Sequence, residues 1–141
     1  GMYHREHGSG DFFNYKYFSA WMRIALMHPN KLFYAYTKSL PYWRDWLETR
    51  GAIPENFKLI ASKGGTWDHL IDQLGLRYSE VVFHPDEALE LGLRIDHTDE
   101  IALFSDENFA LLLHGTQPAG SEASKAKVKM NKERIKYSYS R

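Results

Sequence analysis

The chain has 141 residues, which is enough for one domain with a substantial hydrophobic core. A hydrophobic content of 43% and an aromatic content of 15% exclude a disordered chain. The sequence contains no cysteine, which excludes disulfides and thiolate metal sites, and no apolar run long enough to span a membrane. We therefore expect a folded cytoplasmic protein that does not contact a membrane.

The charge is balanced overall but unevenly distributed. There are 18 basic and 18 acidic residues. Between residues 121 and 141, seven Lys or Arg and two Glu give a net charge of +5, so the rest of the chain carries −5.

We predict one α/β domain over residues 1–120 and a basic extension, helix or tail, over residues 121–141. The extension is suited to contact nucleic acid through phosphates, and a solvated terminus is the alternative explanation.

The first predicted elements are a short strand and an amphipathic helix. Residues 3–12 predict the strand, which ends in a Gly-Ser-Gly-Asp turn. The helix follows, with Asn14 as its N-cap and the His28-Pro29 pair at its end. Its apolar stripe has the helical period and consists of Phe18, Trp21, Met22, Ala25 and Leu26.

Further strand and helix signals alternate along the chain. Residues 31–37, 57–62 and 80–84 are β-rich apolar runs that predict buried parallel strands. A helix with Pro41 in its first turn and Gly51 at its end follows the first of them. The other two runs lead into helices with predicted N-caps at Thr66 and Asp86.

The pattern changes near the end of the domain. Residues 101–104 and 109–114 are apolar runs that flank four turn-type residues, which predicts a β-hairpin. The predicted fold is therefore α/β, with about four βα units, a mainly parallel sheet (a partial, TIM-like or open barrel) and a C-terminal β-hairpin. A complete eight-stranded barrel needs about 200 residues or more. The unpaired edge of an incomplete barrel predicts a homodimer or a partner chain.

The loops that follow parallel strands meet at one edge of the sheet, where α/β proteins bind ligands. Lysines, small hydroxyl side chains and glycine-exposed backbone N–H groups in these loops favour an anion such as a phosphate, nucleotide or carboxylate. The candidate ligand-binding residues are Arg5, Ser9, Tyr36, Thr37, Lys38, Ser62, Lys63 and His114. The candidate acid–base residues are His7, Asp11 and His84. Capping and turn formation are the alternative explanation for such residues, as at Ser39.

Metal chemistry has a weaker basis in the sequence. His4 and His7 would point to opposite faces of a strand, so they cannot chelate one ion without a bulge. A dispersed site from His7, Asp11, His84 and His114, with a metal activating water, is geometrically possible. Surface or hydrogen-bonded histidines explain the same residues. We predict no metal site, and the sequence does not identify a cofactor.

Three local patterns resemble the phage gene product 88 family, whose members are mostly uncharacterised. They are Arg5-Glu-His-Gly-Ser-Gly-Asp-Phe-Phe13, Phe33-Tyr-Ala-Tyr-Thr-Lys-Ser-Leu40 and Leu113-His-Gly-Thr-Gln117. The Thr-Lys-Ser sequence after a strand is also similar to a motif of a phage family related to radical-SAM barrels. The resemblance implies a barrel-like or partial-barrel α/β fold, a phage-like origin and a location in the host cytoplasm. Such families carry cysteine-rich segments that this chain lacks.

Three functional hypotheses follow. The first is an α/β module that binds or transforms a phosphate-bearing or nucleotide-like molecule at the strand ends. The second is a nucleic-acid or replication-associated accessory module that uses the basic segment. The third, implied by the resemblance alone, is the remnant of a radical-SAM-like enzyme whose cluster segment is lost or lies on another chain.

Overall fold

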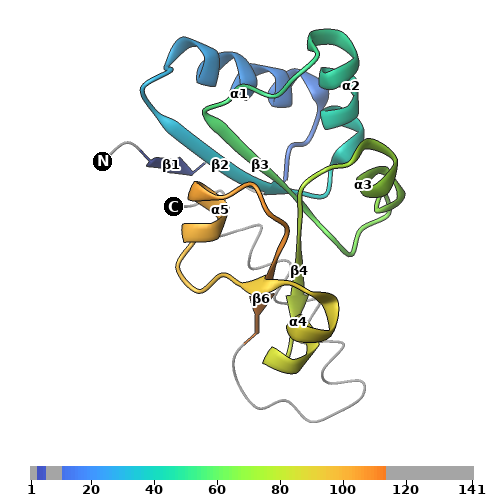
Figure 1. The fold of residues 1–141 in the computed structure, drawn as a ribbon. Coiled ribbons are helices and arrows are strands. Elements are labelled where there is room, and N and C mark those ends of the chain that lie inside the picture. The colour runs from blue at the N-terminus through green and yellow to red at the C-terminus, as the bar shows by residue number, and fades with distance from the viewer. Residues whose placement is uncertain (1–2, 6–10, 114–141) are drawn as a thin grey trace.

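The computed structural model describes residues 3–5 and 11–113. It contains one open sheet with the strand order β1-β2-β3-β4-β6-β5, in which every neighbouring pair is parallel (Figure 1). The strands are β1 (Tyr3–Arg5), β2 (Leu32–Thr37), β3 (Phe57–Ser62), β4 (Tyr78–Val82), β5 (Arg94–Ile95) and β6 (Phe109–Leu112). The helices are α1 (Tyr15–Met27), α2 (Leu40–Arg50), α3 (His69–Leu74), α4 (Pro85–Leu91) and α5 (Glu100–Phe104). The predicted α/β fold with a mainly parallel, open sheet is confirmed, and the predicted domain boundary at residue 120 lies outside the described residues.

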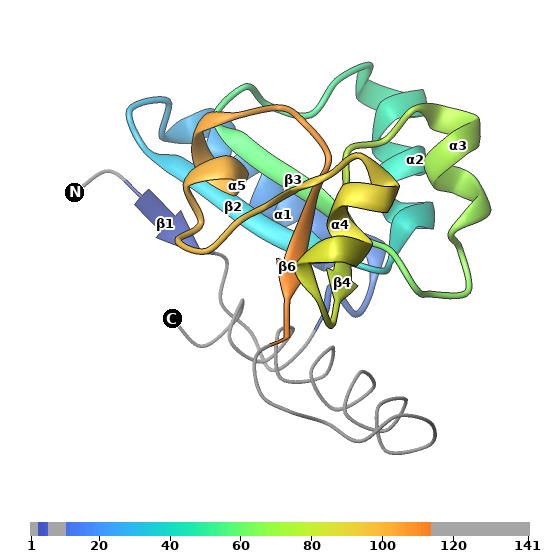
Figure 2. The same ribbon diagram turned by 60° about the horizontal axis from the view of Figure 1, so that its bottom comes forward.

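The strand order determines which face of the sheet each helix covers. From β1 to β4 the chain moves across the sheet in one direction, so right-handed crossovers place α1, α2 and α3 on one face. The step from β5 back to β6 runs in the opposite direction, which places α5 on the other face. Figure 2 shows α5 in front of β2 and β3, with α1 behind them.

Each face of the sheet has its own hydrophobic core. The larger core packs α1, α2 and α3 on the sheet and includes Phe18, Met22, Trp43, Trp46, Phe33 and Leu59. The smaller core lies under α5 and contains Ile101, Ala102, Leu103, Tyr34, Tyr36, Ile60 and Phe109. Alternation along β2 explains this division, because Phe33 and Ala35 face one core while Tyr34 and Tyr36 face the other.

Local capping explains why α1 and α2 begin and end where they do. The Asn14 side chain accepts a hydrogen bond from the Tyr17 N–H at 2.7 Å, which confirms the predicted N-cap. Pro41 lies in the first turn of α2, and Gly51 ends the helix with φ +87°. Such a backbone conformation favours glycine, as the sequence predicts.

The predicted C-terminal hairpin is wrong. Residues 100–104 form α5, and β6 pairs in parallel with β4 and β5 instead of folding back on the preceding segment. The apolar run is too short for its periodicity to distinguish a helix from a strand. Side chains outside the helix hold it in this form: the Asp96 carboxylate accepts a hydrogen bond from Ala102 N–H at 3.0 Å, and Arg77, 24 residues before Ile101, donates to the carbonyls of Ile101 and Ala102.

The sheet is weakly joined at its centre. β2 and β3 pair over five residues, from Phe33–Phe57 to Thr37–Ala61, whereas β3 and β4 pair only at Ala61–Tyr78 and Ser62–Ser79. Residues 57–60 therefore pair with β2 on one side and have no strand partner on the β4 side among the described strands. The divergence of β3 and β4 is visible in Figure 1.

The described residues include no helix with the length and apolar character needed to cross a membrane.

Asn56 fixes the connection between α1 and β2. Its Nδ2 lies 2.8 Å from Ala25 O and 3.0 Å from both His28 O and Lys31 O. We expect Asn56→Ala to lower the free energy of unfolding by about 1–3 kcal/mol, because all three carbonyls lose the Asn56 amide and, among the described residues, Ala25 O and His28 O keep only a backbone N–H donor each. Urea denaturation measures the change. The control is Asn30→Ala, an exposed position in the same connection; equal effects of both variants would contradict this role.

Candidate functional site

Asp11 ties the segment after β1 to the carboxyl end of β2. Its Oδ1 accepts hydrogen bonds from the Thr37 hydroxyl at 2.6 Å and from Phe12 N–H at 2.7 Å. Its Oδ2 accepts one from Lys38 N–H at 2.6 Å. Three donors on one carboxylate fix its position, so Asp11 orders the loop after β2.

Lys38 extends the network from β2 to β3. Its Nζ lies 3.1 Å from Ser62 O, 3.4 Å from Ser62 Oγ and 3.4 Å from Lys63 O. The aliphatic part of Lys38 packs on the next loop: a Cβ added to Gly65 would lie 3.3 Å from Lys38 Cδ. The ammonium group is therefore held at the carboxyl end of β3.

The glycine loop after β3 presents backbone N–H groups, as expected, and binds a carboxylate from its own chain. Gly64 has φ +116°. The Asp68 carboxylate accepts hydrogen bonds from Gly64 N–H at 2.9 Å and Gly65 N–H at 3.0 Å. The residue that precedes α3 is therefore Asp68, and the predicted cap at Thr66 is wrong. These two N–H groups therefore donate to Asp68, and the predicted anion site at the strand ends stays a prediction.

Lys63 points from the same loop toward β4. Its Nζ lies 3.5 Å from Glu80 Oε1 and 5.0 Å from the centre of the Tyr78 ring. The Lys63 side chain is 42% exposed, so solvent and small solutes can reach it.

The other predicted residues lie apart from this cluster or outside the described residues. His84 caps α4, because its Nδ1 accepts a hydrogen bond from Asp86 N–H at 3.0 Å; the predicted cap at Asp86 is wrong. Tyr36 is buried in the core under α5. Arg5 belongs to β1, where it pairs with Tyr34. The remaining predicted residues, His7, Ser9 and His114, lie outside the described residues.

The structure thus brings together Asp11, Thr37, Lys38, Ser62 and Lys63 at the carboxyl ends of β2 and β3; we call these residues the strand-end cluster. Within the described part of the chain, no group of three or more His, Asp or Glu side chains is arranged to hold a metal ion. Two members of the dispersed metal site considered above, His7 and His114, are not among those residues.

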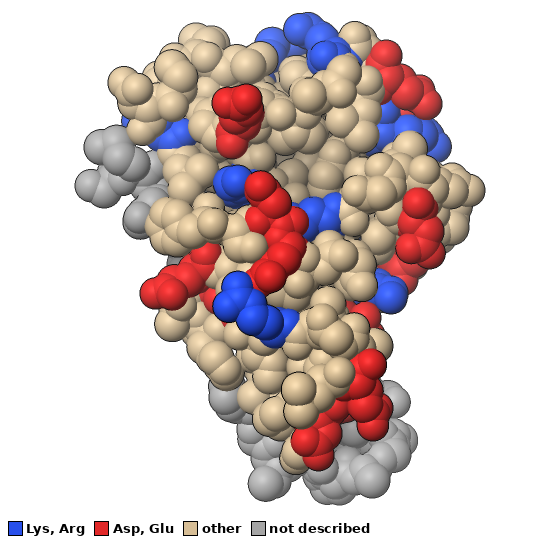
Figure 3. All heavy atoms as spheres, in the orientation of Figure 1, with Lys and Arg blue, Asp and Glu red and all other residues tan. Residues whose placement is uncertain are grey.

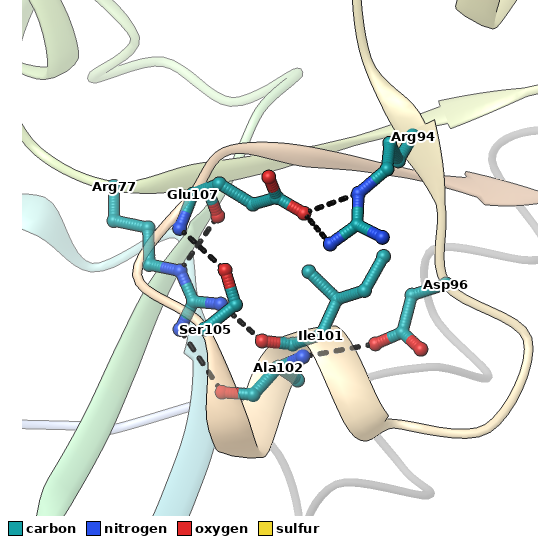
Figure 4. Close-up of polar contacts among 7 residues, drawn as sticks. All are labelled: Arg77, Arg94, Asp96, Ile101, Ala102, Ser105 and Glu107. Atoms are coloured by element: carbon teal, nitrogen blue, oxygen red, sulfur yellow. Dashed lines mark hydrogen bonds and ion pairs between the residues drawn. The ribbon is translucent and has the colours of Figure 1, made fainter.

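A second polar network, at the amino ends of the strands, is absent from the sequence prediction (Figure 4). The Arg77 guanidinium donates to Glu107 O, Ala102 O and Ile101 O at 2.9, 3.0 and 2.6 Å. Burial lowers the pKa of Arg77, although neighbouring acidic groups oppose this shift. Arg94 pairs with the Glu107 carboxylate in the same network.

Lys58 and Asp106 lie beside Arg77. Lys58 Nζ is 2.9 Å from Asp106 Oδ1, and this hydrogen bond holds the pKa of Asp106 below its usual value. The one signal in the sequence is Lys58 itself, a charged residue inside the otherwise apolar run 57–61. Nothing in the local sequence pattern indicates the partners of Arg77.

The open parallel sheet and its strand-end cluster place the protein among α/β proteins with polar residues at the carboxyl edge of the sheet. A match to the family described as gene product 88 covers residues 1–132. The chain belongs to the gene product 88 family, an uncharacterised, phage-type family, and the predicted resemblance is confirmed. Comparison with curated proteins and with solved structures finds no match.

An isosteric substitution tests whether Asp11 acts as a clamp, by which we mean its hydrogen bonds to Thr37 and Lys38. In Asp11→Asn one carboxylate oxygen becomes an NH₂ group, which cannot accept a hydrogen bond from Thr37 or Lys38. We expect the free energy of unfolding to fall by about 1–3 kcal/mol. Urea denaturation measures this change, with Asp45→Asn, which removes a partly exposed charge from α2, as the control. A loss no larger than the control's would contradict the clamp.

Proposed function

We propose that this protein binds a phosphate-bearing or nucleotide-like small molecule at the carboxyl ends of β2 and β3. The observation that carries the proposal is the position of the Lys38 ammonium, 3.4 Å from the Ser62 hydroxyl at the end of β3. The Ser62 hydroxyl accepts from the Lys38 ammonium and has its own proton to donate to a phosphate oxygen, and the positive charge of Lys38 attracts the anion. The carboxyl edge of a parallel sheet is also where ligands bind in α/β proteins.

Lys63 supplies a second positive charge in the next loop. Its side chain is 42% exposed, whereas Glu80, its partner, is 22% exposed and has a buried Oε1. In this proposal a phosphate therefore shares the exposed Lys63 ammonium with Glu80 and does not displace it. Asp11 acts in this proposal as a positioning residue, because it holds the backbone N–H of Lys38 and the hydroxyl of Thr37.

The Gly64–Gly65 loop sets the geometry of the site. Its N–H groups are satisfied by Asp68 and the Lys38 stem packs against it. The loop therefore supports the lysines, and the side chains of Lys38, Ser62 and Lys63 make the contacts to the ligand. This assignment predicts that charge removal at the lysines weakens binding.

Binding is testable by thermal unfolding in the presence of inorganic phosphate, AMP or glucose 6-phosphate, with adenosine and glucose as uncharged comparators. A ligand at 100 times its Kd stabilises the folded state by about 2.7 kcal/mol. We expect the phosphate-bearing compounds alone to raise the melting temperature. The double variant Lys38→Met, Lys63→Met should lose this stabilisation while keeping much of the aliphatic packing.

The matched control is the double variant Lys16→Met, Lys31→Met, which removes the same two positive charges from exposed positions. Undiminished stabilisation of the Lys38→Met, Lys63→Met variant by phosphate compounds would contradict the proposal.

The second candidate function is nucleic-acid binding through residues 121–141, which carry +5. It predicts stabilisation by short single-stranded DNA that weakens steeply with salt and disappears when residues 121–141 are deleted.

A further inference from the structure

A cleft opens at the edge of the sheet opposite the strand-end cluster, at the amino ends of β3 and β4. Its volume is about 490 Å³. Trp43, Ile53, Phe57 and Leu59 supply apolar lining, and Lys58 and Arg77 supply positive charge. Figure 3 shows basic and acidic side chains gathered across the centre of one face of the molecule. We call this feature the amino-edge cleft.

The short ladder between β3 and β4 explains the cleft. The two strands pair only at residues 61–62 and 78–79, so the preceding part of β3 lies open on its β4 side. The segment 105–108 bounds this opening, with Asp106 on the rim of both the amino-edge cleft and the neighbouring hollow of about 590 Å³. A contiguous sheet would fill this space with strand pairing.

In the amino-edge cleft the acidic side chains are more exposed than the basic side chain of Lys58. The Lys58 side chain is only 24% exposed, whereas the side chain of Asp106, its partner at 2.9 Å, is 87% exposed. Glu55, the other acidic residue of the lining, is also exposed. A solute that enters the cleft therefore passes carboxylates at the mouth and meets cations inside.

The hydrogen-bond acceptors of Arg77 do not neutralise its positive charge. An arginine has five N–H donors, and within the described part of the chain Arg77 makes three hydrogen bonds, all to the neutral carbonyls of Glu107, Ala102 and Ile101. Burial lowers the pKa of Arg77 despite the nearby carboxylates, which means that these carboxylates do not fully offset the cost of burying its charge. An anion bound in the cleft would offset more of it.

We propose that the amino-edge cleft binds a small organic anion, with a carboxylate or phosphate group on an apolar body. The anionic group displaces Asp106 from Lys58 and is attracted by the charge of Arg77, and the apolar body contacts Ile53, the half-buried apolar residue of the lining. Displacement costs little, because an ion pair with one highly exposed partner is weak. Asp106 thus competes with the ligand for Lys58. This site is separate from the strand-end cluster, and either can exist without the other.

Titration calorimetry of the full chain tests this site with benzoate and phenyl phosphate as probes and benzyl alcohol as the uncharged comparator. We expect at least one anion to bind with a Kd of about 1 mM or tighter and the alcohol to bind more weakly. Lys58→Met should raise the Kd about tenfold, and Asp106→Asn should lower it about threefold. The comparison of the two anions distinguishes a carboxylate site from a phosphate site.

Control variants separate this site from general charge effects and from the strand-end cluster. Lys31→Met and Glu48→Gln make the same charge changes at exposed positions outside the cleft and should leave the Kd unchanged. The Asp106→Asn result is decisive even if Lys58→Met folds poorly, because tighter binding cannot come from unfolding. The proposal is overturned if neither anion binds, or if Asp106→Asn does not bind the anion more tightly. It is also overturned if Lys38→Met abolishes binding while Lys58→Met leaves the Kd unchanged.

Discussion

The Arg77 guanidinium connects parts of the fold that strand pairing leaves weakly joined. It lies at the start of β4, donates to the carbonyls of Ile101 and Ala102 in α5, and stacks over the Phe109 ring of β6 at 5.2 Å. Because α5 packs on β2 and β3, this one side chain links the two halves of the sheet. The direct ladder between β3 and β4 is short and pairs only Ala61 with Tyr78 and Ser62 with Ser79.

The same arrangement gives the two edges of the sheet different characters. At the carboxyl edge, Lys38 donates through its backbone N–H to Asp11 and through its ammonium to Ser62, so the segments that follow β1 and β2 and the end of β3 form one network. At the amino edge β3 and β4 separate, and charged side chains lie between them where backbone pairing is missing. Lys58 and Arg77 therefore lie in a cleft, where a ligand can reach them. The two proposed anion sites therefore lie at opposite edges of the sheet: one in the hydrogen-bonded network at the carboxyl edge, and one in the cleft at the amino edge.

The sequence predicted those parts of the fold that depend on local pattern. The strand at 57–62 and the Asn14 cap were correct because apolar runs and capping side chains act on their immediate neighbours. The segment 100–104 was not predictable, because its helical form depends on Arg77, 24 residues or more away along the chain. The site shows the same division: topology places Lys38 at the correct edge, but only the structure shows its ammonium at Ser62.

The most direct test of ligand binding at the strand-end cluster is a titration of the ¹⁵N-labelled protein with inorganic phosphate, followed by amide chemical shifts. The account predicts saturable shifts at Lys38, Ser62 and Lys63, because these residues surround the proposed anion position. Saturable shifts elsewhere that leave these amides unmoved, or no saturable shift at all, would contradict the proposal that an anion binds at the carboxyl ends of β2 and β3.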